Sequence, residues 1–292
     1  MYELIQISEH DYYIDCPAKI GLVKTGAAEV VAIDSGNDKD AGKKLLKHVE
    51  ANGWILKAIY NTHSHADHVG GNKLVQARTG CRIFAKGLEA AYTNCPGLES
   101  MTLYGGNPLG ELKNKFLMAQ PSSAEPLTAE ALPDGWEMVE LPGHSFDMTG
   151  FRTPDNNIYI GDCVSSKETL AKYGIGYLWD PEEYVNTLEK LKTLKANTFV
   201  PAHAPVSSEI AELAQININA ANEVCRRILE LCGEGIAFED LLQKVFEAYG
   251  LTMNASQYVL IGSTVRSYLS YLQRIGKIDY SFENNFMLWH SL

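Results

Sequence analysis

The chain has 292 residues, of which 46% are hydrophobic, and it carries a net charge of −11. This length allows one sizeable hydrophobic core plus an appendage. An acidic surface repels phosphate backbones, which disfavours a general nucleic-acid-binding protein. The first residues contain no basic leader and no long apolar run, so we expect neither a signal peptide nor a membrane span. The six cysteines form no Cys-x-x-Cys pair, which favours reduced thiols and a cytoplasmic protein.

The first third of the chain alternates between strand and helix patterns. Short apolar runs separated by glycine indicate antiparallel strands that open a first sheet, and a later apolar run is typical of a buried strand. One segment places leucines on one helical face and lysines on the other, and a glycine closes the next helix. We therefore expect strands at 12–14, 20–23, 30–33, 54–60 and 82–85, a turn at 34–37, and helices at 40–51 and 72–78.

Residues 88–132 differ from their surroundings because they show no clean period. A long irregular segment inside a compact domain is usually functional or disordered, and the aromatic and methionine content here argues against disorder. We interpret this insertion as a wall or lid of a substrate cleft. The alternative is that it covers apolar surface or forms a dimer contact. Residues 173–179, rich in tyrosine and glycine, are a second candidate for the cleft wall.

The remaining chain first completes the sheets and then becomes mostly helical. A proline in the first turn and a face of leucines indicate a helix between the last two strand patterns. The final part is typical of three helices followed by a hairpin. We expect strands at 137–141, 158–160 and 198–200, helices at 181–196, 210–232, 238–249 and 257–273, and a hairpin from 275–280 and 286–289 with its turn at 283–285.

A histidine-rich loop follows the strand expected at 54–60. His63, His65, Asp67 and His68 stand within six residues. Alternate residues of an extended chain point to the same side, so His63 and His65 can reach one ion together. The glycines that follow allow a sharp turn, which lets Asp67 and His68 face a second position. Imidazole nitrogens and carboxylate oxygens of this kind suit a borderline metal such as zinc.

Three further donors stand at the ends of later strand patterns. His144 lies in a Pro-Gly-His-Ser run, Asp162 ends an apolar run, and His203 lies in a Pro-Ala-His-Ala-Pro run. With the loop, they supply five imidazoles and two carboxylates, enough for two metal ions. Alternation along the chain directs Cys163 away from its neighbour Asp162, so we do not expect it to be a ligand.

These residues resemble the metallo-β-lactamase-fold hydrolases. The resemblance lies in the His-x-His-x-Asp-His motif, the later Pro-Gly-His and Gly-Asp, and the late histidine, in that order. It implies that one metal is held by His63, His65 and His144. It implies that Asp67, His68 and His203 hold a second metal, with Asp162 as the bridge. Asp162 resembles the bridging aspartate of the glyoxalase II, lactonase and nuclease branches.

The same resemblance implies an α/β fold, a four-layer αββα sandwich with the metals at one edge of its sheets. We expect a catalytic domain at 1–209 and a helical, winged-helix-like domain at 210–292. This tail has six basic and nine acidic residues from 211 onward, so we favour a structural or dimerising role over nucleic-acid binding. Its apolar helix faces predict packing on the metal domain, on a partner copy in a homodimer, or on both.

The expected activity is hydrolysis of a small ester, thioester or lactone by a hydroxide that bridges two divalent metal ions. Zinc is the favoured metal, with manganese or iron as alternatives, and Asp67 would orient the attacking hydroxide. The sequence has no Gly-x-Ser-x-Gly elbow, consistent with a nucleophile that the protein does not supply. The alternatives are a phosphodiesterase or ribonuclease of the same fold, a mononuclear iron enzyme resembling the sulfur dioxygenases, and a non-catalytic binding protein.

Overall fold

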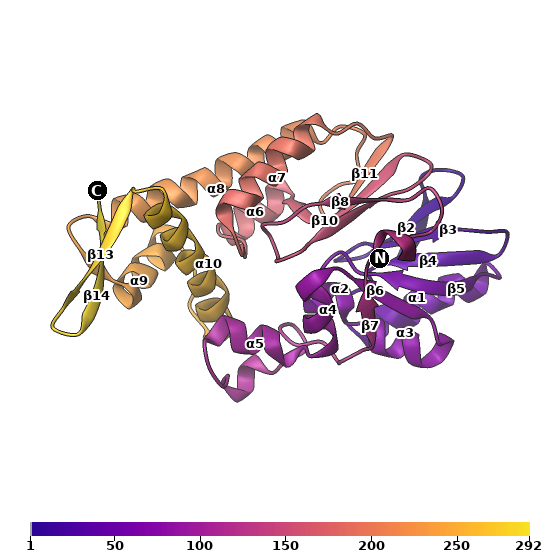
Figure 1. The fold of residues 1–292 in the computed structure, drawn as a ribbon, viewed down its shortest axis with the longest axis horizontal. Helices are drawn as coiled ribbons and strands as arrows, with labels where there is room; N and C mark the ends of the chain where they lie inside the picture. The colour runs from indigo at the N-terminus through magenta and orange to yellow at the C-terminus, as the bar shows by residue number, and fades with distance from the viewer. Residues whose placement is uncertain (1) are drawn as a thin grey trace.

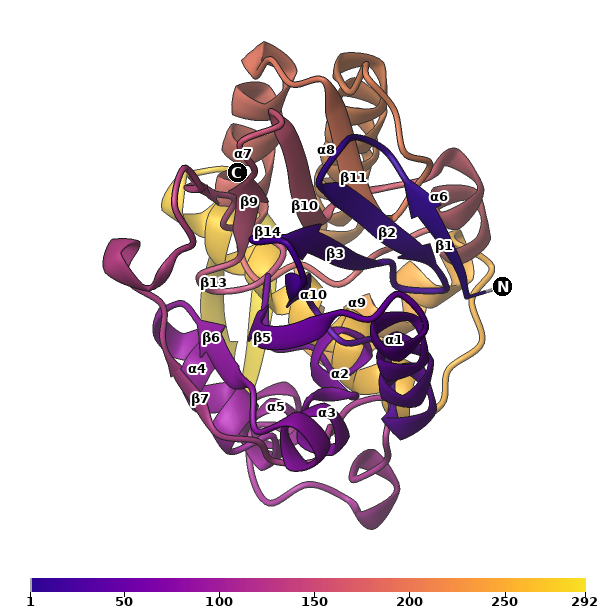
Figure 2. The ribbon, with the colours of Figure 1, turned by 90° about the vertical axis from the view of Figure 1, so that its right-hand side faces the viewer.

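The structure, a computed structural model, describes residues 2–292. Its two larger sheets pack face to face between outer helices, and a third sheet of three strands lies in the tail (Figures 1 and 2). The first sheet has its seven strands in chain order, antiparallel as far as β4 and parallel from β4 to β7. Its strands are β1 (Glu3–Gln6), β2 (Asp11–Asp15), β3 (Ile20–Lys24), β4 (Glu29–Ile33), β5 (Ile55–Tyr60), β6 (Arg82–Ala85) and β7 (Ala124–Pro126). The second sheet has the order β11-β10-β9-β8, from β8 (Glu137–Glu140), β9 (Thr149–Arg152), β10 (Asn157–Ser165) and β11 (Thr198–His203).

Three apolar cores separate the four layers of this αββα arrangement. One core lies between the sheets and contains Tyr60, Phe84 and Phe151. A second packs the first sheet against the helices α1 (Lys39–Ala51) and α3 (Asn72–Thr79), and a third packs the second sheet against α7 (Pro181–Thr193) and the long tail helix. The α/β sandwich expected from the family resemblance is therefore the fold of this chain.

Local sequence explains why the helices begin and end where they do. The Asp38 carboxylate accepts hydrogen bonds from the backbone N–H groups of Asp40 and Ala41, which caps α1. The helix then buries its leucine face against the first sheet, as its amphipathic pattern predicts. Gly80 ends α3 with a φ of 68°, a left-handed conformation that glycine adopts without steric cost.

The expected strands and helices of this part are present, with larger shifts at three ends. β11 extends to His203, three residues past its expected end. β10 continues to Ser165, so Asp162 lies inside a strand instead of at its end. The continuation is possible because the pairing with β11 shifts register on both sides of Gly161, which has a φ of 50°. Helix α7 ends at Thr193, three residues before the expected end. Cys163 is fully buried in the apolar layer under α7, away from the metal-binding groups.

The insertion contains more regular structure than its sequence indicates. It forms α4 (Gly87–Asn94) and α5 (Gly97–Tyr104), short 3₁₀ turns at Gly110–Leu112 and Ala129–Ala131, and the edge strand β7. Helices of eight residues cover only two turns, which is too short to establish a visible hydrophobic period. A four-residue helix, α2 (Ala66–Val69), carries the last part of the histidine-rich loop.

The tail consists of α8 (Ala211–Cys232), β12 (Ile236–Ala237), α9 (Phe238–Ala248), α10 (Ala255–Arg274), β13 (Ile278–Glu283) and β14 (Phe286–Ser291). Its helices share one continuous apolar core with the second sheet, so the expected packing on the metal domain is confirmed. Leu269 and Leu272 are fully buried in that core. Ile275, which we expected in the first strand of the hairpin, instead lies at the end of α10 and is exposed. Phe286 is exposed in the projecting hairpin.

The tail also meets the insertion on the side where the metal loop lies. Figure 1 shows α10 descending from the tail onto α5. A separate small apolar cluster joins Leu103, Leu112 and Leu117 of the insertion to Val259 of α10. The last residue of the helix α6 (Lys167–Tyr173) lies close to residues of α10 and of the insertion, and the segment after it lies beside α10. Every helix within residues 2–292 is too short or too polar to span a lipid bilayer.

Candidate metal centre

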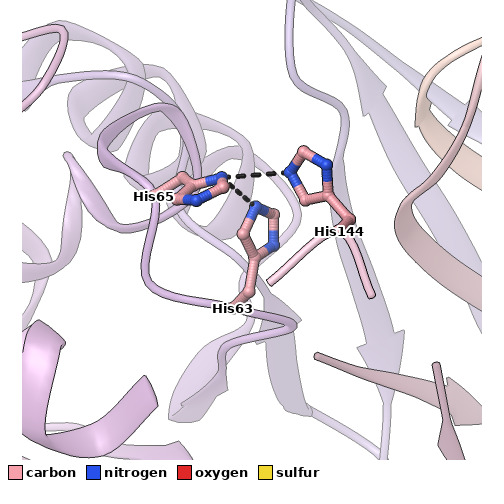
Figure 3. A group of neighbouring side chains, drawn as sticks. All are labelled: His63, His65 and His144. Atoms are coloured by element: carbon pink, nitrogen blue, oxygen red, sulfur yellow. Dashed lines mark hydrogen bonds between the residues drawn. The ribbon is translucent and has the colours of Figure 1, made fainter. Parts of the chain in front are cut away.

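Three histidine side chains converge at the end of the two sheets where β5 terminates (Figure 3). His65 Nδ1 lies 3.0 Å from His63 Nε2 and 3.1 Å from His144 Nε2. His63 and His65 come from the loop after β5, and His144 comes from the loop between β8 and β9. The structure thus brings together the three residues that the resemblance assigns to one metal.

A second group of four side chains lies beside the first. The ligand-type atoms of Asp67, His68, Asp162 and His203 all lie within 4.8 Å of one another. His203 Nε2 is 3.0 Å from Asp67 Oδ2, and His68 Nε2 is 3.1 Å from Asp162 Oδ1. His203 is the last residue of β11, so the parallel pairing of β10 with β11 brings it to Asp162.

Asp162 lies between the two groups. Its Oδ1 faces His68, and its Oδ2 is 3.5 Å from His144 Nε2 and 3.4 Å from His203 Nε2. Gly161 makes this approach possible, since a Cβ atom there would lie 3.0 Å from the Thr62 side chain. All seven ligands predicted from the sequence are therefore close together, whereas His10, His48 and His290 make their hydrogen bonds elsewhere.

Asp34 is linked by hydrogen bonds to one histidine of each group. Its Oδ2 accepts hydrogen bonds from His68 Nδ1 at 2.8 Å and from Thr62 Oγ1 at 2.8 Å, and Thr62 Oγ1 is 3.0 Å from His63 Nδ1. These contacts occupy the outward ring nitrogens and leave the Nε2 atoms of both histidines facing the centre. Carboxylates in this position orient metal-binding histidines and fix their tautomers. The sequence alone indicates Asp34 only as a turn residue.

Glu89 of α4 holds the two ligand loops together. Its Oε2 accepts from Ser64 N at 2.8 Å and from Ser64 Oγ at 2.6 Å. Its Oε1 accepts from Ser145 Oγ at 2.6 Å and from Asp147 N at 3.0 Å. Ser64 stands between two ligands of the first loop, and Ser145 follows His144 in the second. One fully buried carboxylate therefore fixes both loops, and the sequence patterns do not identify it.

The pKa values of the histidines shift down in the first group and up in the second. Burial, together with the other nearby histidines, lowers the pKa of His63 well below its usual value and that of His65 to about 3. In the second group, burial opposes the effect of the neighbours, yet Asp162 and Asp67 raise the pKa of His68 well above its usual value. The neighbouring histidines, against burial, lower the pKa of Asp67 to about 2. The first group thus presents neutral imidazoles, the form that binds metals. In the second group the carboxylates are ionised and keep His68 protonated, so His68 must lose a proton when a metal binds.

The arrangement fits divalent metal ions. His68 Nε2 and Asp162 Oδ1 are buried and lack a hydrogen bond of acceptable geometry, although they face each other. In the first group, three imidazole nitrogens face one another within a small volume. Tetrahedral ligands at about 2.0–2.1 Å from zinc lie about 3.3 Å apart, close to the spacing of these nitrogens. The donor set has the nitrogen and oxygen chemistry of zinc, manganese and iron sites.

A cavity of about 550 Å³ opens beside the metal-binding groups. The candidate ligands His65, Asp67 and Asp162 form part of its wall. The wall also includes Asn37 of the turn before α1, Glu99 and residues 115–117 of the insertion, Tyr173 of α6, and residues of α10 including Gln257. A larger cavity, of about 800 Å³, is lined by residues of β4, β5 and β6 but by none of the ligands, so the smaller one is the substrate candidate.

Two further side chains lie beside the candidate ligands but are not among the ligands expected from the sequence. The Tyr177 ring lies with its centroid 5.2 Å from that of His65 and 5.9 Å from that of His144, and burial raises its pKa. Glu99 of α5 has a carboxylate oxygen 3.8 Å from His65 Nε2, and burial with nearby carboxylates raises its pKa to about 8. Tyr177 lies in the segment expected at the cleft wall, whereas no local signal marks Glu99.

Known proteins resemble this chain in sequence at moderate identity. A hydroxyacylglutathione hydrolase from Rhodospirillum rubrum is 28% identical over 192 residues, which cover 65% of this chain and 59% of the relative. The matched part is thus less than two thirds of that relative's length. A hydroxyacylglutathione hydrolase from Methylococcus capsulatus is 27% identical over 234 residues, which cover 79% of this chain and 76% of the relative.

Solved structures match the whole chain, tail included. A metallo-beta-lactamase family protein from Thermus thermophilus superposes with a TM-score of 0.72 at 17% identity, covering 99% of this chain and 97% of that one. A beta-lactamase domain protein from Burkholderia ambifaria gives a TM-score of 0.75 at 13% identity, with coverages of 99% and 94%. At such identities the likeness concerns the fold alone.

The family itself is established by the sequence. A family model described as the Metallo-beta-lactamase superfamily matches residues 13–203, well over half of the chain. That range begins in β2, ends at His203 and includes every residue of the two metal-binding groups. The chain belongs to the metallo-beta-lactamase superfamily.

Proposed function

We propose that this protein is a metal-dependent hydrolase of small esters, thioesters or lactones, with two divalent ions held by the seven clustered side chains. His63, His65 and His144 would hold one ion, and Asp67, His68 and His203 would hold the other. Asp162, which faces both groups, would contribute to both. Such ions lower the pKa of bound water and polarise a carbonyl oxygen when present. The position of Asp162 between the two groups is the observation that carries this proposal.

The chain's own side chains prepare the site for this reaction. Asp34, through His68 and Thr62, keeps the candidate ligand nitrogens aimed at the centre. Asp67 would orient the attacking hydroxide when metal is bound. In hydrolysis, an oxygen from water bonds to the carbonyl carbon, the bond from that carbon to sulfur or oxygen breaks, and the departing atom takes up a proton. The insertion and the tail wall the cavity and limit the substrate to a small molecule.

Two lines of evidence support a thioester or ester substrate. The relatives from R. rubrum and M. capsulatus bear the name hydroxyacylglutathione hydrolase, which describes thioester hydrolysis. The net charge of −11 disfavours a polyanionic substrate such as nucleic acid. We also propose that 1–209 and 210–292 are the two domains, with the second contributing α10 to the cavity of the first.

A substrate panel combined with metal analysis tests this function. Protein purified without chelators is assayed on thioesters, lactones, aryl phosphodiesters and single-stranded RNA, and its metal content is measured after reconstitution. We expect close to two equivalents of metal and turnover of thioesters or esters. RNA or phosphodiester cleavage without esterase activity would replace the proposed reaction by phosphodiester hydrolysis. A single equivalent of iron with oxygen uptake on a persulfide would replace it by oxygenation.

A further inference from the structure

The hairpin at the end of the tail leaves one of its strands with a free edge. Within residues 2–292 the third sheet has the order β12-β14-β13, so β13 pairs with β14 on one side and lies at the edge of the sheet. Figure 1 shows the hairpin projecting at the end of the molecule farthest from the first sheet. The free backbone groups of an edge strand can pair with a strand of another chain.

Alternate residues of β13 direct their backbone groups to this free edge. The Leu292 N–H donates to the Lys277 carbonyl at 2.9 Å, so the odd-numbered residues from 277 onward form their backbone hydrogen bonds toward β14. The N–H and C=O groups of the even-numbered residues therefore point away from β14. Consistent with this, the Tyr280 N–H donates to the carboxylate of its own neighbour Asp279, at 2.9 Å. The even-numbered residues can thus form an antiparallel ladder with a further strand.

The even-numbered residues of β13 also carry its apolar side chains, which lie on one face of the hairpin. Ile278 is buried against the helical core, whereas the side chains of Tyr280 and Phe282 are 44% and 71% exposed. Met287 lies opposite Phe282 on β14 and extends this exposed face. Proteins commonly protect an edge strand with a lysine, a proline or a bulge, and β13 contains none of these. Its edge is therefore open to association.

The charges beside the edge favour a second copy of the same strand as the partner. In a two-fold antiparallel pair centred on Tyr280, Lys277 of each copy lies opposite Glu283 of the other. Opposite charges then face each other at both ends of the paired strands, which stabilises the pair. Ile278 lies opposite Phe282 in the same arrangement, so the apolar faces of the two hairpins become continuous.

Neighbouring registers of the same two-fold pair bring like charges together. A centre one residue nearer the turn places Asp279 opposite Glu283, and a centre one residue farther from the turn places Asp279 opposite Asp279 of the second copy. Like charges directly opposite each other are destabilising. With the centre on Tyr280, Asp279 instead lies opposite Ser281, whose hydroxyl can donate a hydrogen bond to it. The sequence of β13 is therefore complementary to itself in this register.

We propose that the protein forms a two-fold dimer in which β13 pairs antiparallel with β13 of a second copy, centred on Tyr280, so that the two three-stranded sheets become one. The residues that line the candidate substrate cavity include none of the hairpin, so this inference does not rest on the proposed reaction. A strand edge with its apolar side chains buries less than the roughly 1,600 Å² of a standard interface. We therefore expect a dissociation constant on the order of micromolar.

Sedimentation of the full chain over a range of concentrations tests the dimer and its register. We expect the unmodified protein to change from monomer to dimer with rising concentration. Glu283→Lys and Lys277→Glu each place like charges opposite each other at both ends of the strand, so each should weaken association about tenfold. The variant that combines both substitutions pairs opposite charges again and should restore the dimer. Glu50→Lys, an equal charge change at an exposed residue of α1, should associate like the unmodified protein.

Hydrogen exchange shows whether the contact is a backbone ladder on β13. The amides of Tyr280 and Phe282 face the free edge, so their exchange should slow as the protein concentration rises. In Glu283→Lys at the same concentration this protection should be lost. Association in which the exchange of both amides stays unchanged would place the contact on another surface and overturn the inference.

Three further results would also overturn the inference. The first is a chain that remains monomeric at every concentration up to its solubility limit, which would leave the edge to a strand of another protein. The second is a dimer that forms equally well in Glu283→Lys and Lys277→Glu. The third is a combined variant that keeps the melting temperature of the unmodified protein but does not regain association, since the proposed register requires that it does.

Discussion

The ligand loops and the segments packed around them contribute to the metal centre in different ways. The loops at 62–69 and 142–148 carry five of the seven candidate donors, and the other two stand on β10 and β11; all seven lie in short runs that are visible in the sequence. None of the seven candidate ligands comes from the insertion or the tail, yet Glu89 joins the two loops and α10 closes one wall of the cavity. Local motifs thus supply the donors of the site, whereas packing between distant segments aligns them.

Substitution of a ligand should have the largest effect. His63→Ala and Asp162→Ala each remove one side chain that would hold a metal ion, so the remaining candidate ligands bind that ion less well. We expect kcat to fall by at least about a thousandfold. Asp162→Ala affects both metal-binding groups because its two oxygens face both. Metal content per chain and steady-state kinetics measure the result. Substitution of the remote His48, which hydrogen-bonds the Tyr2 carbonyl, serves as a control and should retain activity.

The origin of these donors explains how much of the site the sequence predicts. Four of seven ligands lie within six residues after a strand, where the chain leaves a sheet and local spacing is enough. Glu89 contacts Ser64 and Ser145 across 25 and 56 residues, and helices of two turns show no period. Asp34 resembles an ordinary turn aspartate until folding brings His68 to it. Supporting residues therefore become recognisable only in the folded chain.

The same distinction applies to the fold. Amphipathic and apolar runs predict most strands and helices near their observed bounds, because these patterns are local. The extension of β10 past Asp162 depends on its register with β11, and the exposure of Phe286 depends on which face of the tail meets the core. The sandwich itself comes from the family resemblance, since periodicity does not determine how two sheets stack.

Removing a core side chain in the tail tests whether its core is continuous with that of the metal domain. Leu269 of α10 is fully buried in the cluster shared with the second sheet. Leu269→Ala should lower the free energy of unfolding by about 2–5 kcal/mol through lost burial and the cavity left behind. Phe286→Ala, at a residue 63% exposed, should change it by about 0.5 kcal/mol or less. Calorimetry in which Leu269→Ala melts the tail separately would show two independent cores.

Weakening the Glu89 contacts should produce a smaller effect that is specific to the metal. In Glu89→Gln, either orientation of the amide places its NH₂ group against Ser64 N or Asp147 N, two backbone donors that cannot become acceptors. We expect zinc affinity to fall about 10–100-fold, the usual consequence of losing an outer partner of metal ligands. Competition with a chromophoric chelator measures this affinity.

A matched control separates metal positioning from general stability. Asp11 is also a fully buried carboxylate and accepts hydrogen bonds from Thr153 and Asn157, both at 2.6 Å, without contacting a ligand loop. Asp11→Asn should lower the melting temperature and leave zinc affinity unchanged. If Glu89→Gln behaves in the same way, Glu89 stabilises the fold but does not position the ligands.

The smallest expected effect concerns the contact between the tail and the segment that carries Tyr177. Thr264 Oγ1 of α10 accepts a hydrogen bond from Leu178 N at 3.1 Å, and Thr264 is fully buried. Thr264→Val leaves that N–H without an acceptor, which should cost about 1 kcal/mol and speed hydrogen exchange at the Leu178 amide. Thr264→Ser retains the hydroxyl and should keep the exchange rate. Because Tyr177 packs beside His65 and His144, a loosened segment should also raise KM. Unchanged exchange and KM in Thr264→Val would mean that the tail supports the cavity wall only through apolar packing.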